Sequence, residues 1–216
     1  MNEEKVLQIL GRVGAVITDS HIVYTSGKHG TAYVNKDAVF PNLKESDALA
    51  GVLARRFVAG EVEVVIGPAV AGALFARDVA RELQGLTARK IRPVYAEKPE
   101  GGDIFVIKRG YGTLIAGKNV LVVEDVLTTG GSVKKVIKAT RAVGGNVVGV
   151  GALCHRGGIT AADVGLETGR LEAIVNITLD AWDEDECLRV GPCSRGAPIN
   201  TDVGKGREFL ARRRLI

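Results

Sequence analysis

The sequence predicts an α/β protein whose mostly parallel central sheet is flanked by helices on both faces. Apolar runs of strand length alternate with helical patterns along the chain, and these runs carry few polar residues. Such strands are typical of parallel sheets that are buried on both faces. Glycine is also frequent, with 28 of 216 residues against a usual share of about 7%, which indicates tight turns and close backbone approaches. Ligands of such sheets bind at the carboxyl ends of the strands.

The chain is expected to begin with helices. Apolar spacing predicts an opening helix from Val6, Leu7, Leu10 and Val13. A polar segment at 18–29 interrupts this pattern, and the next helical pattern covers 43–58. The sheet is therefore expected to start only after residue 60.

The first strand–loop–helix unit follows directly. A strand is predicted at 62–66, a turn at Gly67-Pro68 and an alanine-rich helix at 69–83. A further strand is expected at 91–95. The glycine-rich and charged segment at 98–112 is then expected to form a long mobile hairpin, or lid.

The same order of elements returns in the second half. A strand at 120–123 leads through a loop at 124–131 into a helix at 132–143, whose apolar residues keep helical spacing while its lysines face outward. Two more apolar strands are expected, at 147–153 and 173–177. Two loops at the carboxyl ends of strands thus become the candidate ligand loops, 67–72 and 124–132.

Composition excludes several classes of protein. Hydrophobic residues make up 46% and charged residues 25%, which argues against long disorder or a disulfide scaffold. The net charge of +4 decides little between an ordinary surface and an anionic ligand. Aromatic residues make up only 5%, so a nucleic-acid surface built from several stacking aromatics is not expected.

The cysteines indicate a reducing compartment. Cys154, Cys187 and Cys193 form neither an even disulfide set nor a CxxC pair, and no histidines stand near them at zinc-finger spacing. We therefore expect reduced cysteines and a cytoplasmic protein. The chain has no signal-peptide pattern and no apolar run of about 20 residues, so no membrane association is expected.

One segment, 120–132, combines several features that bind a sugar phosphate. Four apolar residues precede Glu124 and Asp125, and two threonines, two glycines and Ser132 then open a helix. Backbone N–H groups at a helix N-terminus hold phosphate, and glycines allow its close approach. The upstream carboxylates can accept hydrogen bonds from vicinal sugar hydroxyls. A buried strand followed by an ordinary helix cap would explain any two of these features, but not all of them at this spacing.

This segment resembles the phosphoribosyl-pyrophosphate signature of the type I phosphoribosyltransferases. Thr25-Ser26-Gly27-Lys28, with Tyr33 soon after, is similar to the base-binding hood of orotate phosphoribosyltransferases. The likeness runs over nearly the whole chain. It implies the type I phosphoribosyltransferase fold as a single domain over 1–216, with a small N-terminal hood from about 1–40, a mobile lid loop and a C-terminal extension at 183–216.

The resemblance also implies roles for individual residues. Glu124 and Asp125 would bind the ribose hydroxyls, Lys98 would begin the catalytic lid, and Arg156 would contact the pyrimidine. The residues implied as catalytic are Asp125, Glu124, Lys98 and Arg109. The residues implied to bind substrate are Lys28, Tyr33, Gly67, Pro68, Ala69, Val70, Ala71, Gly72, Lys108, Thr128, Thr129, Gly130, Gly131, Ser132 and Arg156.

The chain departs from the family pattern in the lid and the hood. The family's lid carries a second lysine and a histidine followed by glycine, whereas Lys98 here precedes Pro-Glu-Gly-Gly and the next basic residues are Lys108 and Arg109. Thr25 stands where many members have lysine. The segments FVIKRGYG at 105–112 and CSRGAPI at 193–199 are similar to a separate bacterial branch of orotate phosphoribosyltransferase-like sequences.

The implied reaction is transfer of the phosphoribosyl group from phosphoribosyl pyrophosphate to orotate in de novo pyrimidine biosynthesis. The resemblance further implies Mg²⁺ held mainly by the substrate phosphates, without a set of protein ligands, and a homodimer in which the lid reaches the neighbouring site. Two alternatives stay open. One is transfer to another nucleobase, and the other is a regulator of this fold that binds nucleic acid, for which the sequence offers no helix-turn-helix.

Other motifs carry less weight. The segment 112–119 spells most of a Walker A box, but Asn119 replaces the Ser/Thr and a strand follows rather than precedes it, so a hairpin turn is expected. Gly149 and Gly151 lack the third glycine of a dinucleotide fingerprint and lie within a predicted strand. His29 and His155 flank proposed site residues, where a structural role is the more frequent one. The arginine run at 212–214 is expected to be a solvated helix end.

Overall fold

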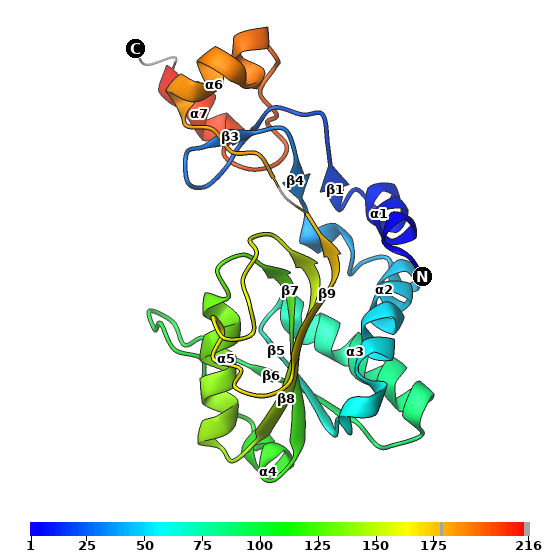
Figure 1. The fold of residues 1–216 in the computed structure, drawn as a ribbon. Coiled ribbons are helices and arrows are strands. Elements are labelled where there is room, and N and C mark those ends of the chain that lie inside the picture. Colours follow the sequence, from blue (N-terminus) through cyan, green and yellow to red (C-terminus); the bar gives the residue numbers. More distant parts are fainter. Residues whose placement is uncertain (178, 214–216) are drawn as a thin grey trace. The chain divides into compact units, whose positions relative to one another are not determined.

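The computed structural model describes residues 1–177 and 179–213, which divide into two compact units (Figure 1). Unit 1 comprises residues 1–6 and 40–177, and unit 2 comprises residues 7–39 and the described part of 178–216. Unit 2 is therefore built from both ends of the chain. Residues 214–216 of the expected C-terminal extension, including Arg214, lie outside the described residues.

Unit 1 contains a fully parallel sheet of five strands in the order β6-β5-β7-β8-β9. The strands are β5 (Val64–Pro68), β6 (Arg92–Ala96), β7 (Asn119–Leu127), β8 (Asn146–His155) and β9 (Arg170–Asn176). Every residue of β5 is buried, as its unbroken apolar sequence predicts. Because all strands run the same way, their carboxyl ends meet at one edge of the sheet. The predicted α/β class is confirmed.

Helices cover both faces of this sheet (Figure 1). On one face α2 (Leu43–Arg56) and α3 (Ala71–Thr87) pack against each other and against the strands, and η2 (Val58–Gly60) follows α2. On the other face α5 (Gly131–Ala142) packs on β7, β8 and β5. Buried side chains of α5, among them Val133, Val136 and Ile137, join alternate residues of the strands in one apolar core.

Two glycines of β8 make room for α2. A Cβ atom placed at Gly149 would lie 2.6 Å from the ring of Phe57, and one at Gly151 would lie 2.7 Å from Leu53. Any larger side chain would push α2 away from the sheet. These glycines therefore serve packing inside a strand, which explains their resemblance to part of a dinucleotide fingerprint.

Two elements differ from the sequence predictions. Residues 112–119 do not form a hairpin turn, because α4 (Tyr111–Ile115) occupies their first half and β7 begins at Asn119. The buried side chain of Ile115 gives this helix a place in the core. β7 also continues to Leu127, so the expected loop at 124–131 begins four residues late. In the expected lid, Glu97 and Val106 form two backbone hydrogen bonds, of 2.9 and 2.8 Å, that close a hairpin.

Unit 2 combines short strand pairs with short helices. Its N-terminal elements are β1 (Val16–Ile17), β2 (Ile22–Val23), β3 (His29–Gly30), β4 (Tyr33–Val34) and η1 (Lys36–Ala38), and α1 (Glu3–Arg12) crosses the unit boundary. Its C-terminal elements are α6 (Glu184–Val190), η3 (Pro192–Arg195) and α7 (Gly206–Arg213). β1 pairs with β4 and β2 with β3, both antiparallel.

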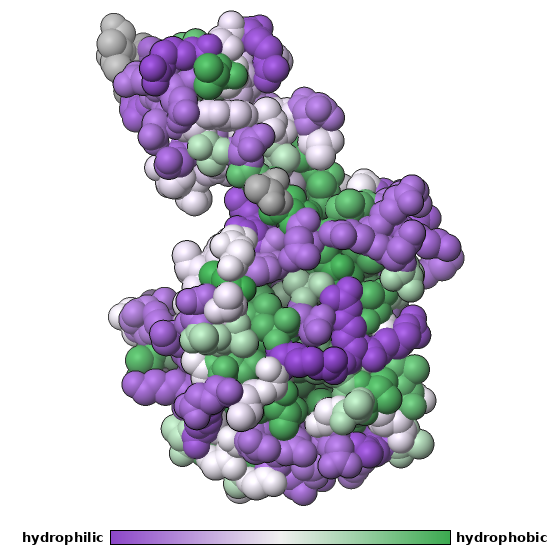
Figure 2. Space-filling model, viewed as in Figure 1, coloured by the Kyte–Doolittle hydropathy of each residue, from purple (hydrophilic) through white to green (hydrophobic). Residues whose placement is uncertain are grey.

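Backbone hydrogen bonds join the two chain segments of unit 2. His29 and Trp182 exchange two of them, at 2.7 and 2.8 Å, and the N–H of Asn200 donates to His21 at 2.8 Å. The helices add little apolar burial, because α6 buries only Cys187 and α7 buries Gly206 and Phe209. Figure 2 accordingly shows mostly hydrophilic residues over α6 and α7. Within 1–177 and 179–213, no helix is long and apolar enough to cross a lipid bilayer.

Candidate functional site

The two predicted carboxylates lie near the carboxyl end of the central strand. Glu124 and Asp125 belong to β7 itself, and their exposed fractions are only 7% and 3%. The N–H of Asp125 donates to Glu124 Oε1 at 3.1 Å, and the N–H of Val126 donates to Asp125 Oδ1 at 2.6 Å. These bonds fix both carboxylates against the backbone. The carboxylates are thus buried within a strand, whereas the sequence predicted them in a loop.

The predicted phosphate loop follows directly. Gly130 has a φ of 71°, and a Cβ atom there would lie 2.5 Å from the side chain of Val164. Glycine is therefore required for the backbone to turn into α5. A Cβ at Gly131, in contrast, would meet only Thr129 Oγ1 within 4 Å, at 3.6 Å. The first N–H groups of a helix have no intrahelical partner and attract anions.

A small cavity lies between these features. Its volume is about 50 Å³, and it is lined by Glu124, Val126, Leu127, Thr128, Thr129, Gly130, Gly131, Ser132 and Val133. A water molecule needs about 10–15 Å³ by this measure, so the cavity has room for a group of several heavy atoms. One cavity thus contacts both a buried carboxylate and the N-terminus of α5.

The other candidate ligand loop, 67–72, lies against the same carboxylate. It joins β5 to α3, and its Ala69–Val70 peptide bond is cis. A Cβ atom at Gly72 would lie 2.6 Å from Pro68 and 3.3 Å from Glu124 Oε1, and one at Gly67 would overlap the carbonyl oxygen of Gly72. Because β5 and β7 are neighbours, their two loops meet at one edge of the sheet. The structure therefore brings the two candidate ligand loops together.

Two of the lid cations, Lys98 and Arg109, form ion pairs with acids in or beside the lid. Lys98 Nζ lies 3.4 Å from Asp103 Oδ1, which also contacts Lys135 at 2.6 Å. The hydrogen bond from Lys135 lowers the pKa of Asp103. Arg109 donates to Glu97 Oε1 through Nε at 2.8 Å. Lys108 is exposed.

Arg156 follows β8 directly and lies beside the end of β7. Its N–H donates to the carbonyl of Leu127 at 2.7 Å, and the residue is half-buried. A structural alternative is that Arg156 pairs with a surface acid such as Asp163, and this carboxylate accepts two hydrogen bonds from Thr160, both at 2.7 Å. His155 has a structural contact, since its Nε2 accepts the N–H of Ile159 at 3.0 Å.

The remaining predicted residues, Lys28 and Tyr33, belong to unit 2. Lys28 follows the turn at Tyr24–Gly27, and its Nζ lies 3.3 Å from Asp183 Oδ1. Tyr33 is half-buried in β4 opposite Ile17.

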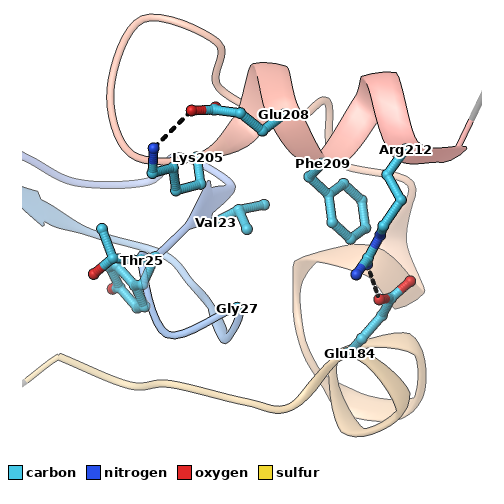
Figure 3. Close-up of a pocket in the computed structure, with 9 residues that line it drawn as sticks. Val23, Thr25, Gly27, Glu184, Lys205, Glu208, Phe209 and Arg212 are labelled. Atoms are coloured by element: carbon cyan, nitrogen blue, oxygen red, sulfur yellow. Dashed lines mark hydrogen bonds and ion pairs between the residues drawn. The ribbon is translucent and has the colours of Figure 1, made fainter.

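Unit 2 also contains an open cavity of about 410 Å³ (Figure 3). Thr25 and Gly27, from the segment that resembles a base-binding hood, line one side. Phe209 of α7 projects toward the cavity from the opposite side. Two ion pairs lie at its rim, Lys205–Glu208 at 2.7 Å and Arg212–Glu184 at 2.9 Å. The cavity is therefore lined by two aromatic side chains, Tyr24 and Phe209, among charged groups.

A second group of chemically active side chains was missed by the sequence analysis. His21, His29, Cys187 and Cys193, here called the His₂Cys₂ cluster, have ligand atoms within 4.8 Å of one another. The histidines and the cysteines are up to 172 positions apart in the sequence, so no local spacing brings them together. The available signal was a histidine pair and a cysteine pair, each within eight residues. Burial lowers the pKa of His29, with His21 as the second cause.

Known proteins are similar to this chain over the residues that contain both candidate ligand loops. Residues 35–177 match the family model of the phosphoribosyl transferase domain. The orotate phosphoribosyltransferase of Thermoanaerobacter sp. (strain X514) is 36% identical over 199 residues, which cover 92% of this chain and 96% of that relative.

Solved structures share the fold. The orotate phosphoribosyltransferase of Mycobacterium tuberculosis H37Rv in complex with Fe(III) dicitrate has a TM-score of 0.63 at 21% identity, covering 81% of this chain and 95% of that one. The same protein in complex with 5-phospho-α-D-ribosyl 1-diphosphate has a TM-score of 0.58 at 20% identity, with the same coverage.

Proposed function

The chain belongs to the phosphoribosyl transferase family, among the orotate phosphoribosyltransferases, and we propose that it transfers the phosphoribosyl group of phosphoribosyl pyrophosphate to orotate. The products are orotidine 5′-phosphate and pyrophosphate, as pyrimidine biosynthesis requires. A ring nitrogen of orotate forms a bond to the anomeric carbon while the bond from that carbon to the pyrophosphate oxygen breaks. The electron pair of the broken bond stays on pyrophosphate, and the proton of the ring nitrogen passes to pyrophosphate or water.

One observation carries this proposal. The cavity of about 50 Å³ has Glu124 on its wall together with the first residues of α5. A 5-phosphate at the helix N-terminus and ribose hydroxyls at the carboxylates would be held by a single loop. The carboxylates Glu124 and Asp125 would then lie beside the sugar, where they stabilise positive charge that develops on its ring in the transition state.

The loop at 67–72 is proposed to hold the leaving group. Its contact with Glu124 supports this role, because pyrophosphate is attached to the carbon next to the hydroxyls that the carboxylates would bind. Gly72 and Gly67 permit close approach of backbone N–H groups to an anion. The remaining negative charge calls for cations, of which Lys98, Lys108 and Arg109 in the lid are the candidates.

Mg²⁺ is proposed as the cofactor. The carboxylates of Glu124 and Asp125 are oxygen ligands of the kind it prefers, and it commonly binds through substrate phosphates with few protein ligands. Within the described residues, the one group of three or more potential ligands is the His₂Cys₂ cluster, which offers nitrogen and sulfur instead. When bound, Mg²⁺ supplies charge neutralisation of the leaving pyrophosphate.

Arg156 is proposed to recognise the base. Orotate carries a carboxylate and two carbonyl acceptors, and a guanidinium group offers a rigid fork of donors. The position of Arg156 at the end of β8, next to the end of β7, supports this role. Lys28 and Tyr33, in unit 2, are also proposed to bind substrate, and a homodimer is proposed in which the lid serves the neighbouring site.

A competition experiment tests the base assignment. The protein is incubated with phosphoribosyl pyrophosphate, Mg²⁺ and an equimolar mixture of orotate, uracil, adenine, hypoxanthine and xanthine, and the nucleotide products are separated and quantified. We expect orotidine 5′-phosphate to be the main product. A larger yield of a purine nucleotide would contradict orotate as the substrate, while phosphoribosyl transfer itself would stand.

A further inference from the structure

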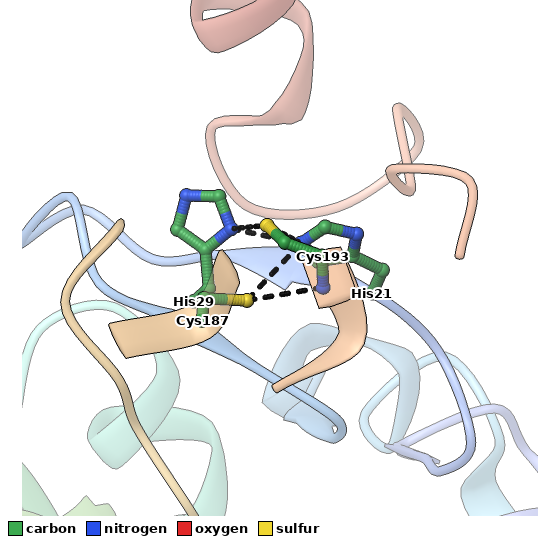
Figure 4. Close-up of side chains that lie close together, drawn as sticks. All are labelled: His21, His29, Cys187 and Cys193. Atoms are coloured by element: carbon green, nitrogen blue, oxygen red, sulfur yellow. Dashed lines mark hydrogen bonds between the residues drawn. The ribbon is translucent and has the colours of Figure 1, made fainter. Parts of the chain in front are cut away.

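The His₂Cys₂ cluster has the composition and the size of a metal site (Figure 4). His21 Nε2 lies 2.8 Å from His29 Nδ1, and Cys193 Sγ lies 3.5 and 3.3 Å from these two nitrogens. Cys187 Sγ lies 4.0 Å from His21 Nε2. All four side chains converge on one point from β2, β3, α6 and η3 or the residues beside them.

These separations are close to those of a tetrahedral zinc centre. With Zn–N bonds of about 2.0 Å and Zn–S bonds of about 2.3 Å, neighbouring ligand atoms are about 3.3–3.8 Å apart. Most of these contact distances would have to change by only a few tenths of an ångström for the cluster to hold an ion. We propose that the His₂Cys₂ cluster binds one structural zinc ion that joins the two chain segments of unit 2.

The hydrogen bonds of His21 prepare it to be a ligand. Its Nδ1 lies 2.8 Å from the carbonyl oxygen of Ala197, and because a carbonyl only accepts, Nδ1 must carry the proton. The neutral imidazole then presents a lone pair at Nε2, toward the other three side chains. A carbonyl group that accepts a hydrogen bond from the other ring nitrogen, and so fixes the tautomer, is typical of metal-binding histidines.

Without an ion the same cluster leaves a polar atom unsatisfied. Because Nδ1 of His21 carries the proton, its Nε2 is an acceptor. The contact between this Nε2 and His29 Nδ1 therefore requires a proton on His29 Nδ1. His29 Nε2 is then a bare acceptor, and it is buried with no hydrogen-bond partner among the residues that the structure describes. With a zinc ion at the cluster, His29 Nδ1 would be a ligand and Nε2 would carry the proton. Nε2 would then be an N–H group that points away from the cluster (Figure 4). The rings of His29 and Phe209 lie at 80° to each other, with centroids 4.8 Å apart.

The sulfur atoms favour zinc over hard cations. Soft thiolates select zinc and related metals, whereas Mg²⁺ and Ca²⁺ prefer oxygen ligands. The N–H of Cys193 donates to Cys187 Sγ at 3.2 Å. Neither cysteine is in a disulfide. Two thiolates and two neutral imidazoles would leave the bound Zn²⁺ centre without net charge, as burial favours.

Unit 2 has a structural need for such a link. Cys187 is the only buried residue of α6, and unit 2 buries its own apolar side chains, such as Ile22 and Val23, apart from the apolar cluster of unit 1 that contains Val64 and Val133. Small units without a large core are commonly held by metals or disulfides. An ion at this position would join the β2–β3 hairpin to the segment that carries the wall of the cavity in Figure 3, since Glu184 and Phe209 lie on that segment.

Metal content tests the proposal without any assay of turnover. The full chain is purified without chelator or added metal, and zinc is measured by mass spectrometry in the wild type, Cys187→Ser, Cys193→Ser and the control Cys154→Ala. We expect about one zinc per chain in the wild type and the control. We expect at least tenfold less zinc per chain in either serine variant.

A cobalt substitution keeps the test independent of how the variants fold. Zinc is removed from wild-type protein with a chelator, Co²⁺ is added, and the visible spectrum is recorded. We expect the intense bands of tetrahedral cobalt and a thiolate-to-cobalt charge-transfer band, with a higher melting temperature on return of the metal. Wild-type protein without metal and without these bands would overturn the proposal, as would a Cys187–Cys193 disulfide. Iron in place of zinc would overturn the assignment to zinc.

Discussion

Gly72 at the start of α3 lies so close to Glu124 of β7 that a Cβ atom on the glycine would come within 3.3 Å of the carboxylate oxygen Oε1. The two residues are 52 positions apart, and the pairing of β5 with β7 brings them together. This contact is the geometric basis for placing a sugar between a carboxylate and a pyrophosphate loop.

Replacing Asp125 tests the carboxylate. Asp125→Asn keeps an oxygen that can accept the N–H of Val126, now at 2.6 Å from Oδ1, so we expect the protein to fold. Loss of the negative charge should lower kcat by about 10²-fold if the carboxylate stabilises the transition state. The control is Glu172→Gln in β9, which removes an ion pair with Arg56 at 3.2 Å. Equal kinetic constants for Asp125→Asn and wild type would remove Asp125 from the mechanism.

Substitutions at two neighbouring glycines test ligand binding and folding separately. Gly131→Val adds a side chain where a Cβ meets only Thr129 Oγ1, so we expect stability to be largely kept while the Kd for ribose 5-phosphate rises at least about tenfold, or about 1.4 kcal/mol. Gly130→Ala should instead lower stability, because φ is 71° and Val164 blocks the Cβ. Calorimetry and thermal unfolding measure the two effects. The control is Gly85→Val, in open space on α3, and equal phosphate affinity of Gly131→Val and wild type would argue against this loop.

The sheet, its helices and the two ligand loops could be predicted because they rest on local patterns. Continuous apolar runs predict β5 and β7, and helical spacing predicts α5. The predicted end of β7 was wrong because Glu124 and Asp125 are polar. The burial of carboxylates inside a strand depends on neighbours that sequence spacing does not reveal. The turn expected at 112–119 was wrong because the packing of Ile115 favours a helix.

Arg156 provides a test of base selectivity. We expect Arg156→Ala to reduce the preference for orotate over uracil by about 10–100-fold, since a hydrogen bond to a charged group contributes about 1.5–3 kcal/mol. The ratio of kcat/KM values for the two bases measures this. Arg170→Ala, at the opposite end of the neighbouring strand β9, is the control. If Arg156→Ala keeps the wild-type ratio, the arginine has a structural role only.

Mixed chains test whether the lid acts on a neighbouring site. Lys98→Ala and Asp125→Asn are each expected to be nearly inactive alone. If Lys98 serves the partner's site, co-refolded heterodimers contain one site with both native residues, and partial activity should return. Isolated heterodimers with no more activity than either parent would place Lys98 in the same chain's site.

Cys154 is expected to be chemically inert. Burial raises the pKa of its thiol to about 12, and Arg156 opposes this shift only in part. A raised pKa keeps the group as a thiol at pH 8, whereas alkylation requires the thiolate. Iodoacetamide should therefore leave Cys154 unmodified in the native protein and modify it after unfolding, as peptide mass spectrometry would show. Equal modification in both states would contradict its burial.

The His₂Cys₂ cluster lay beyond sequence reasoning for a different reason. His29 pairs with Trp182 through the backbone, and Asn200 pairs with His21, so the chain ends meet only in the folded unit. No spacing rule for Cys and His covers ligands that are up to 172 residues apart. The proposed roles of Lys28 and Tyr33 stay predictions, as does the boundary of the hood at about residue 40.

The most direct measurement follows the phosphorus atoms of the substrate. Phosphoribosyl pyrophosphate, orotate and Mg²⁺ are mixed with the protein, and ³¹P NMR follows the 5-phosphate and the pyrophosphate together. We expect equal amounts of orotidine 5′-phosphate and free pyrophosphate, formed only when orotate is present, and loss of both with Asp125→Asn but not with Glu172→Gln. Release of pyrophosphate at the same rate without orotate, or no turnover by the folded wild-type protein, would contradict phosphoribosyl transfer at this site.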